Sequence, residues 1–133
     1  LFNLPKDVLV IAPHPFFVIK SCIGEKLESY IEAFDAIEYS FFNTSYFNLN
    51  KKGKDLAKKY NLPMVGNGDV HFYTDLGPTY SLIDSKKEVT SILDAIRKGK
   101  VKVKTTPLST FHILNKTFSM VFKTFIMNLG GYR

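Results

Sequence analysis

Cysteine and tryptophan are the scarcest residues in this sequence of 133 residues. It contains one cysteine, Cys22, and no tryptophan. A single thiol excludes an internal disulfide and is typical of a reducing compartment, so we expect Cys22 to be a buried structural residue. Neither a Gly-x-Gly-x-x-Gly pattern nor a Walker loop occurs, and no serine or cysteine has the flanking residues of a catalytic nucleophile. Metal-assisted hydrolysis is then the chemistry that the remaining side chains could support.

Acidic residues and long apolar runs are also in short supply. Lys and Arg number 18 against 12 Asp and Glu, which gives a formal net charge of +6. A solvated lysine-rich surface explains this excess, and anionic partners such as phosphate esters or nucleic acid are compatible with it. No signal-peptide pattern opens the chain, and its apolar tail is interrupted by lysines. We therefore expect a cytoplasmic protein without a membrane span.

Apolar segments of alternating period indicate one α/β domain. The hydrophobic content of 45% is enough for a core. Strands are expected at 8–12, 36–39, 64–66 and 101–103; helices are expected at 21–34, from Asn48 or Asn50 to 60, and from a Ser85–Glu88 capping box to Gly99. This order predicts a parallel sheet with helices outside it.

Side chains that bind metals follow two of these predicted strands. His14 comes after the first strand, and Asp69 and His71 come after the third. Parallel strands bring their carboxyl ends to one edge, where α/β proteins build active sites. Asp69 and His71 would share a face in a regular strand, and Pro15 should hold His14 extended. Such a set suits Zn, Mn or Fe, although each motif alone also fits a core histidine or an ordinary turn.

Five motifs occur in an order that resembles the second half of the PHP (polymerase and histidinol phosphatase) family of metal-dependent phosphoesterases. They are Ala12-Pro13-His14-Pro15, Asp35-Ala36-Ile37-Glu38 with Asn43, Asn50-x-x-Gly53-x-x-Leu56-Ala57, Gly66-Asn67-Gly68-Asp69-Val70-His71 and the segment 94–99. The resemblance extends from Val8 to Val103. The sequence departs from the family pattern at Pro13 and Phe16, which flank His14, and at Asn67-Gly68.

The resemblance implies a fold and an activity. The fold would be a distorted (β/α)7 TIM-like barrel of parallel strands and outer helices, of which residues 1–106 form the C-terminal half. Its site would hold up to three divalent metals that activate water to hydrolyse a phosphate ester. His14, Asp69 and His71 would be metal ligands, and none of them the nucleophile. Glu38 and Asn43, placed at a strand end beside the expected site, could support a metal-bound ligand by hydrogen bonding. Both could equally have a structural role, which for Glu38 would be pairing with a lysine.

The family's opening motif, a strand of the type Asp-Leu-His-x-His-Thr, is missing, and no His-x-His occurs. We therefore expect this chain to be the C-terminal part of a longer protein, with the N-terminal half as its required partner. Alone, the chain should dimerise, aggregate or lack full activity, because three ligands cannot hold a cluster of metals. A rival interpretation is a non-catalytic PHP-like module associated with nucleic acid. Substrate, metal identity and oligomeric state are left open by the sequence.

Residues 107–133 form a separate C-terminal segment. Apolar residues recur there at helical spacing: Phe111, Leu114, Phe118, Val121, Phe122 and Phe125. We expect an amphipathic helix packed on the barrel, with a membrane surface or a partner as alternatives. Before this tail, the basic residues Arg97, Lys98 and Lys100 form a cluster that predicts a solvated face, with phosphate contact as the alternative.

Overall fold

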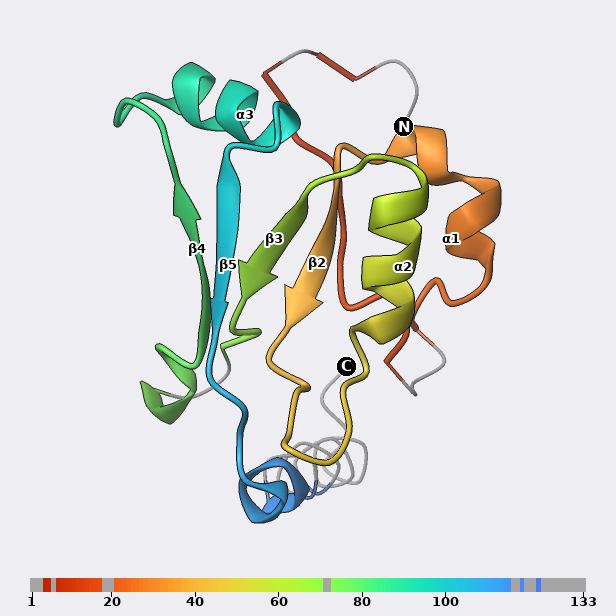
Figure 1. The fold of residues 1–133 in the computed structure, drawn as a ribbon, viewed down its shortest axis with the longest axis vertical. Coiled ribbons are helices and arrows are strands. Elements are labelled where there is room, and N and C mark those ends of the chain that lie inside the picture. Colours follow the sequence, from red (N-terminus) through yellow and green to blue (C-terminus); the bar gives the residue numbers. More distant parts are fainter. Residues whose placement is uncertain are drawn as a thin grey trace, which may run out of the picture.

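Three parallel strands organise the part of the chain that carries His14. The computed structural model describes residues 4–5, 7–17, 21–70, 73–115, 118 and 122. In order, the strands are β1 (Ile11–Ala12), β2 (Ala36–Ser40) and β3 (Met64–Asn67). Two of them, labelled β2 and β3, lie side by side in Figure 1. Their spatial order is β1-β2-β3, with Ile11 opposite Ala36 and Ile37 opposite Met64. The carboxyl ends of all three strands therefore meet at one edge, as predicted.

Helices cover this sheet as the apolar periodicity predicts. The first helical segment consists of α1 (Lys26–Ser29) and a 3-10 turn, η1 (Ile31–Ala33). Helix α2 (Lys51–Lys59) follows β2, and its buried residues Gly53 and Ala57 face the sheet. The main core contains Ala12, Leu27, Ile31, Ile37 and Ala57. Burying such a side chain fully contributes about 1.5–3 kcal/mol for the larger aliphatic residues.

The single helix predicted at 21–34 is wrong in its length. The chain leaves the α conformation at Tyr30, whose φ of −120° separates α1 from η1. Leu27 and Ile31 are both buried, so the apolar contact survives this break. Tyr30, which lies between the two helical pieces, is 55% exposed. The conformation of this segment is therefore determined by the packing of Leu27 and Ile31 in the core more than by a continuous helical period.

A second sheet of two strands lies beside β3, and the sequence predicted only one of the two strands. Its strands are β4 (Thr79–Ile83) and β5 (Val101–Thr105), joined through α3 (Val89–Arg97), and a 3-10 turn, η2 (Tyr73–Asp75), precedes β4. The strands are antiparallel, with Thr79 opposite Thr105. The prediction of a half-exposed strand at 101–103 is confirmed. Its expected parallel pairing is wrong, because β4, which was not predicted, is its partner.

The predicted capping box of the third helix is also wrong. Helix α3 begins at Val89, so Glu88 occupies the cap position and Ser85 lies outside the helix. The side chain of Glu88 caps no backbone group, and instead its Oε2 accepts a hydrogen bond of 3.3 Å from the Ser91 hydroxyl. Gly99 ends the helix with a φ of +69°, which confirms its predicted position. The described residues thus form an α/β structure with a parallel sheet, and no closed barrel occurs among them.

Close contact between the two sheets depends on Gly66. A Cβ atom added there would lie 2.6 Å from the backbone oxygen of Tyr80, and the Ser81 hydroxyl donates a hydrogen bond of 3.0 Å to the Gly66 carbonyl. We expect Gly66→Ala to lower the free energy of unfolding by about 1–3 kcal/mol, because β4 must move away. Urea unfolding followed by circular dichroism measures this loss.

Gly53→Ala is the matched control for that substitution. Its added Cβ would meet Ile37 Cγ2 at 3.4 Å, an ordinary contact, and alanine favours the helix by up to about 1 kcal/mol. We expect this variant to be as stable as the wild type or more stable. Equal stability of the two variants would show that β3 and β4 are not packed as closely as described here.

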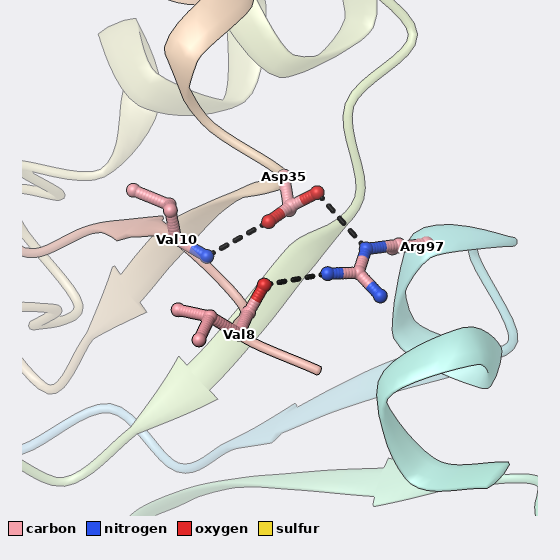
Figure 2. A network of polar contacts seen from close by, with 4 residues as sticks. All are labelled: Val8, Val10, Asp35 and Arg97. Atoms are coloured by element: carbon pink, nitrogen blue, oxygen red, sulfur yellow. Dashed lines mark hydrogen bonds and ion pairs between the residues drawn. The ribbon is translucent and has the colours of Figure 1, made fainter. Parts of the chain in front are cut away.

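Arg97 joins α3 to the amino-terminal edge of the parallel sheet (Figure 2). Its Nε lies 3.1 Å from Asp35 Oδ1, and its Nη2 donates a hydrogen bond of 2.6 Å to the Val8 carbonyl. The other carboxylate oxygen of Asp35 accepts a hydrogen bond of 2.8 Å from the Val10 amide. Arg97 is therefore a structural residue, in contrast to the solvated face that the basic cluster predicted. Lys98 and Lys100 are exposed.

The tail contacts the rest of the chain through a residue outside the predicted stripe. Residues 110–115 are helical, and Ile113 is buried against Phe41 and Phe42. Four members of the stripe, Phe111, Leu114, Phe118 and Phe122, are between 55% and 74% exposed. Val121 and Phe125 lie outside the described residues. The described part of the stripe thus faces away from the sheet, and its burial against a partner stays a prediction.

Within the described ranges, no helix combines the length and the apolar character that are needed to cross a bilayer.

Candidate metal centre

His14 stands in a tight turn directly beyond β1. Its carbonyl accepts a hydrogen bond of 3.1 Å from the Phe17 amide, and its own amide donates one of 2.5 Å to Glu38 Oε2. The turn gives His14 a φ of +24°, so the expectation that Pro15 holds it extended is wrong. The preference of a residue before proline is outweighed here by the bonds that close the turn around the Glu38 carboxylate.

Glu38 is the buried acidic group of this edge. It comes from the middle of β2 and is 3% exposed, and its Oε1 atom is buried without a hydrogen-bond partner among the described residues. Desolvation raises the pKa of Glu38 above its usual value of about 4.5. The His14 backbone hydrogen bond, the charge of His14 and the side chain of Asn67 act in the opposite direction, while the negative charge of Asp69 raises the pKa further. The charges of two predicted ligands, His14 and Asp69, therefore both affect the pKa of Glu38.

Asp69 lies two residues beyond the end of β3. Its φ is +44°, and its amide donates a hydrogen bond of 3.3 Å to Asn67 Oδ1. The turn is compact, because a Cβ on Gly68 would lie 3.3 Å from the Asp75 carbonyl. Asp69 is thus outside the strand, and the argument that it shares a strand face with His71 does not apply. His71 itself lies outside the described residues.

Asn43 and Asn50 make structural contacts that the sequence did not indicate. Asn43 is buried, and its carbonyl accepts a hydrogen bond of 2.8 Å from Leu108, which attaches the tail. Asn50 was noticed only as a helix start, yet its side chain pairs with Ser40 at the end of β2. Its Oδ1 accepts a hydrogen bond of 2.8 Å from the Ser40 amide, and its Nδ2 donates one of 3.0 Å to the Ser40 carbonyl. The Asn50-x-x-Gly53 motif therefore fixes the strand that carries Glu38.

No cavity of substrate size lies beside His14 and Glu38 among the cavities of the described residues. A cavity of about 10 Å³ lies among His14, Glu38, Ser40 and Asn50, with room for about one water molecule. A hollow of about 470 Å³ lies at the other edge of the sheet, beside Arg97 and Asp35. We consider the small cavity more relevant to chemistry, because the predicted ligand His14 and the buried Glu38 border it. In the larger hollow, Asp35 is paired with Arg97.

The donor groups at this edge fit a divalent cation in part. No group of three His, Cys, Asp or Glu side chains within the described ranges is arranged to hold a metal ion. The imidazole of His14 and the carboxylates of Asp69 and Glu38 are nevertheless the donor types that Zn, Mn and Fe accept. A cation at this edge would compensate the desolvated carboxylate of Glu38, whose Oε1 has no other described partner.

A comparison with protein families supports the resemblance for part of the chain. Residues 48–101 match a family model described as PHP-associated. This segment contains α2, β3, β4 and α3 with Asp69 and His71, and it excludes His14 and Glu38. The match is consistent with a PHP C-terminal region and confirms the resemblance there. No curated protein matches the chain.

Proposed function

We propose that this chain forms the C-terminal part of a PHP-type metal-dependent phosphoesterase. The observation that carries the proposal is Glu38, a buried carboxylate with an unpartnered oxygen, which interacts with both His14 and Asp69. A protein interior rarely keeps such a group unless a cation or a proton neutralises it. The PHP-associated match of residues 48–101 agrees with this assignment.

Each residue of the edge would have a separate task. His14, Asp69 and His71 would bind divalent ions, up to three in the complete site, and a bound ion would activate water and neutralise charge on a phosphate ester. Glu38 would hold the backbone of His14 through the bond to its amide and would add negative charge to the site. The substrate class is a phosphate ester, and nucleic-acid ends belong to the same chemistry.

The remaining ligands and strands would come from the N-terminal half of the same protein. In the described part of the chain, β1 pairs with β2 on one side only. An unpaired strand edge with buried side chains is a natural place for a preceding strand to add. We propose that such strands complete a distorted (β/α)7 barrel in the cytoplasm, with the β4–β5 pair beside β3.

A second function is a non-catalytic PHP-like module that binds a protein or nucleic acid. It is favoured by the extent of the family match, which is described as PHP-associated and leaves out His14. The net charge of +6 is compatible with nucleic acid. The two proposals differ in whether the edge holds a metal, so metal binding decides between them.

The experiment uses the complete protein, stripped of metal by a chelator and reloaded with Mn or Zn. We expect stoichiometric metal binding and metal-dependent hydrolysis of p-nitrophenyl phosphate. The chain of residues 1–133 alone should bind less metal and show little or no hydrolysis, because its ligand set is incomplete. Absence of metal binding by the complete protein would refute the enzyme and leave the non-catalytic module.

A further inference from the structure

Cys22 lies against the imidazole ring of His14. Its Sγ atom is 3.2 Å from His14 Nδ1, and both residues are half-buried. A backbone hydrogen bond also joins the segment that follows Cys22 to the segment that follows His14. The Gly24 amide donates a hydrogen bond of 2.8 Å to the Pro15 carbonyl, and Leu27, which follows, is fully buried. The segment that carries Cys22 is thereby attached directly to the turn that carries His14.

The ring of His14 is also constrained from a second side. The Phe17 ring meets it edge to face, with centroids 6.5 Å apart and an interplanar angle of 71°. With Nδ1 occupied by the sulfur, Nε2 is the ring nitrogen left for a metal. A neutral imidazole can bind a metal through Nε2 only when Nδ1 carries the hydrogen. The Cys22 sulfur favours that tautomer when it accepts this hydrogen, whereas a thiol that donated its own hydrogen to Nδ1 would leave the ring hydrogen on Nε2.

We propose that Cys22 is a positioning residue for the metal centre. Its sulfur accepts the hydrogen of His14 Nδ1 and so directs Nε2 toward the ion, a task that a carboxylate or a carbonyl performs in many metal sites. This inference rests on the proposed function, because it requires that His14 binds a metal. It also replaces the sequence-based expectation that Cys22 is a purely structural thiol.

Direct ligation by Cys22 is the competing arrangement. The two ring nitrogens point to different sides of the imidazole, so a metal on Nε2 lies away from the sulfur. A metal held jointly by Nδ1 and Sγ would instead occupy the present contact between them, at about 2.0–2.1 Å from nitrogen and about 2.3 Å from sulfur.

Cobalt binding to the complete protein tests the proposal. Co²⁺ titrations compare the wild type with Cys22→Ser, Cys22→Ala and His14→Ala. We expect the two Cys22 variants to keep the ligand-field spectrum of the wild type but to bind Co²⁺ roughly 10–100-fold more weakly. Unchanged affinity in both variants would overturn the positioning role. A sulfur-to-cobalt charge-transfer band in the wild type that Cys22→Ser removes would show a direct ligand instead.

Two further measurements keep the result interpretable. Nitrogen chemical shifts of His14 in the Zn²⁺-loaded wild type report the tautomer without any substitution, and a hydrogen on Nε2 would contradict the proposal. His14→Ala separates this inference from the proposed function. If His14→Ala does not weaken Co²⁺ binding, the metal role of His14 fails; if it does while the Cys22 variants bind normally, only the positioning role fails.

Discussion

Replacing Asp69 by asparagine in the complete protein should lower its affinity for Mn or Zn by more than about 100-fold, since the loss of a direct ligand exceeds the 10–100-fold effect of a supporting residue. Asparagine keeps the size of the side chain and removes its charge. The turn that holds Asp69 should persist, because its described hydrogen bond uses the backbone amide. Phosphoesterase activity should fall with metal content.

Asp55→Asn is the matched control for this substitution. Asp55 is exposed on α2, so the same chemical change there should alter neither metal content nor activity. Isothermal titration with Mn²⁺ and metal analysis of the purified proteins measure the difference. Normal metal content and turnover in Asp69→Asn would show that Asp69 is not a ligand of the metal site.

Replacing Glu38 by glutamine should have opposite effects on stability and metal binding. At pH 8 the metal-free variant should unfold with a higher free energy than the wild type, because an uncharged amide replaces a carboxylate whose ionised form is disfavoured by burial. The amide oxygen of glutamine can still accept the His14 hydrogen bond. Metal affinity should fall roughly 10–100-fold, because the site loses a supporting carboxylate.

The stability of the metal-free protein should depend on pH in a direction set by the raised pKa of Glu38. Burial raises the pKa of Glu38 in the folded state, so between the unfolded value of about 4.5 and the raised value the folded state binds more protons. Stability therefore decreases as the pH rises through that window, and the penalty is absent below it. Urea unfolding at pH 4 and pH 8, in the presence of a chelator, should show this slope in the wild type and not in Glu38→Gln.

Glu32→Gln, at an exposed position of η1, is the control for stability. It should retain the pH slope of the wild type. A Glu38→Gln protein that is less stable than the wild type at pH 8 would mean that the Glu38 carboxylate is stabilised by groups beyond those described here.

The sequence predicted the parallel sheet and α2 because these elements follow simple rules. Strand β2 is buried along nearly its whole length, and α2 places lysines outward and Ala57 inward. Local pattern failed where a distant partner decides the structure. Thr79–Ile83 alternates more buried and more exposed residues as a strand should, but its role depends on β5, which begins only at Val101. The break at Tyr30 likewise depends on packing against the sheet.

The sequence indicated which residue types lie at the candidate site, but it did not indicate their backbone geometry. His14 and Asp69 do lie beyond strand ends, yet both adopt positive φ angles that no strand-based argument anticipates. Glu38 was left between supporting a ligand and pairing with a lysine, and its described hydrogen bond to the His14 amide favours the first. Cys22 was read as structural, because eight residues of separation gave no signal that its sulfur reaches the His14 ring.

The central claim is that His14 and Asp69 bind a metal at the carboxyl edge of the parallel sheet. Anomalous X-ray diffraction from crystals of the complete protein, collected at the Mn or Zn absorption edge, tests it most directly. We expect an anomalous peak within about 2.0–2.2 Å of His14 Nε2 and of an Asp69 carboxylate oxygen, near the buried Glu38. A fully loaded protein whose anomalous peaks all lie away from these two side chains would contradict the claim.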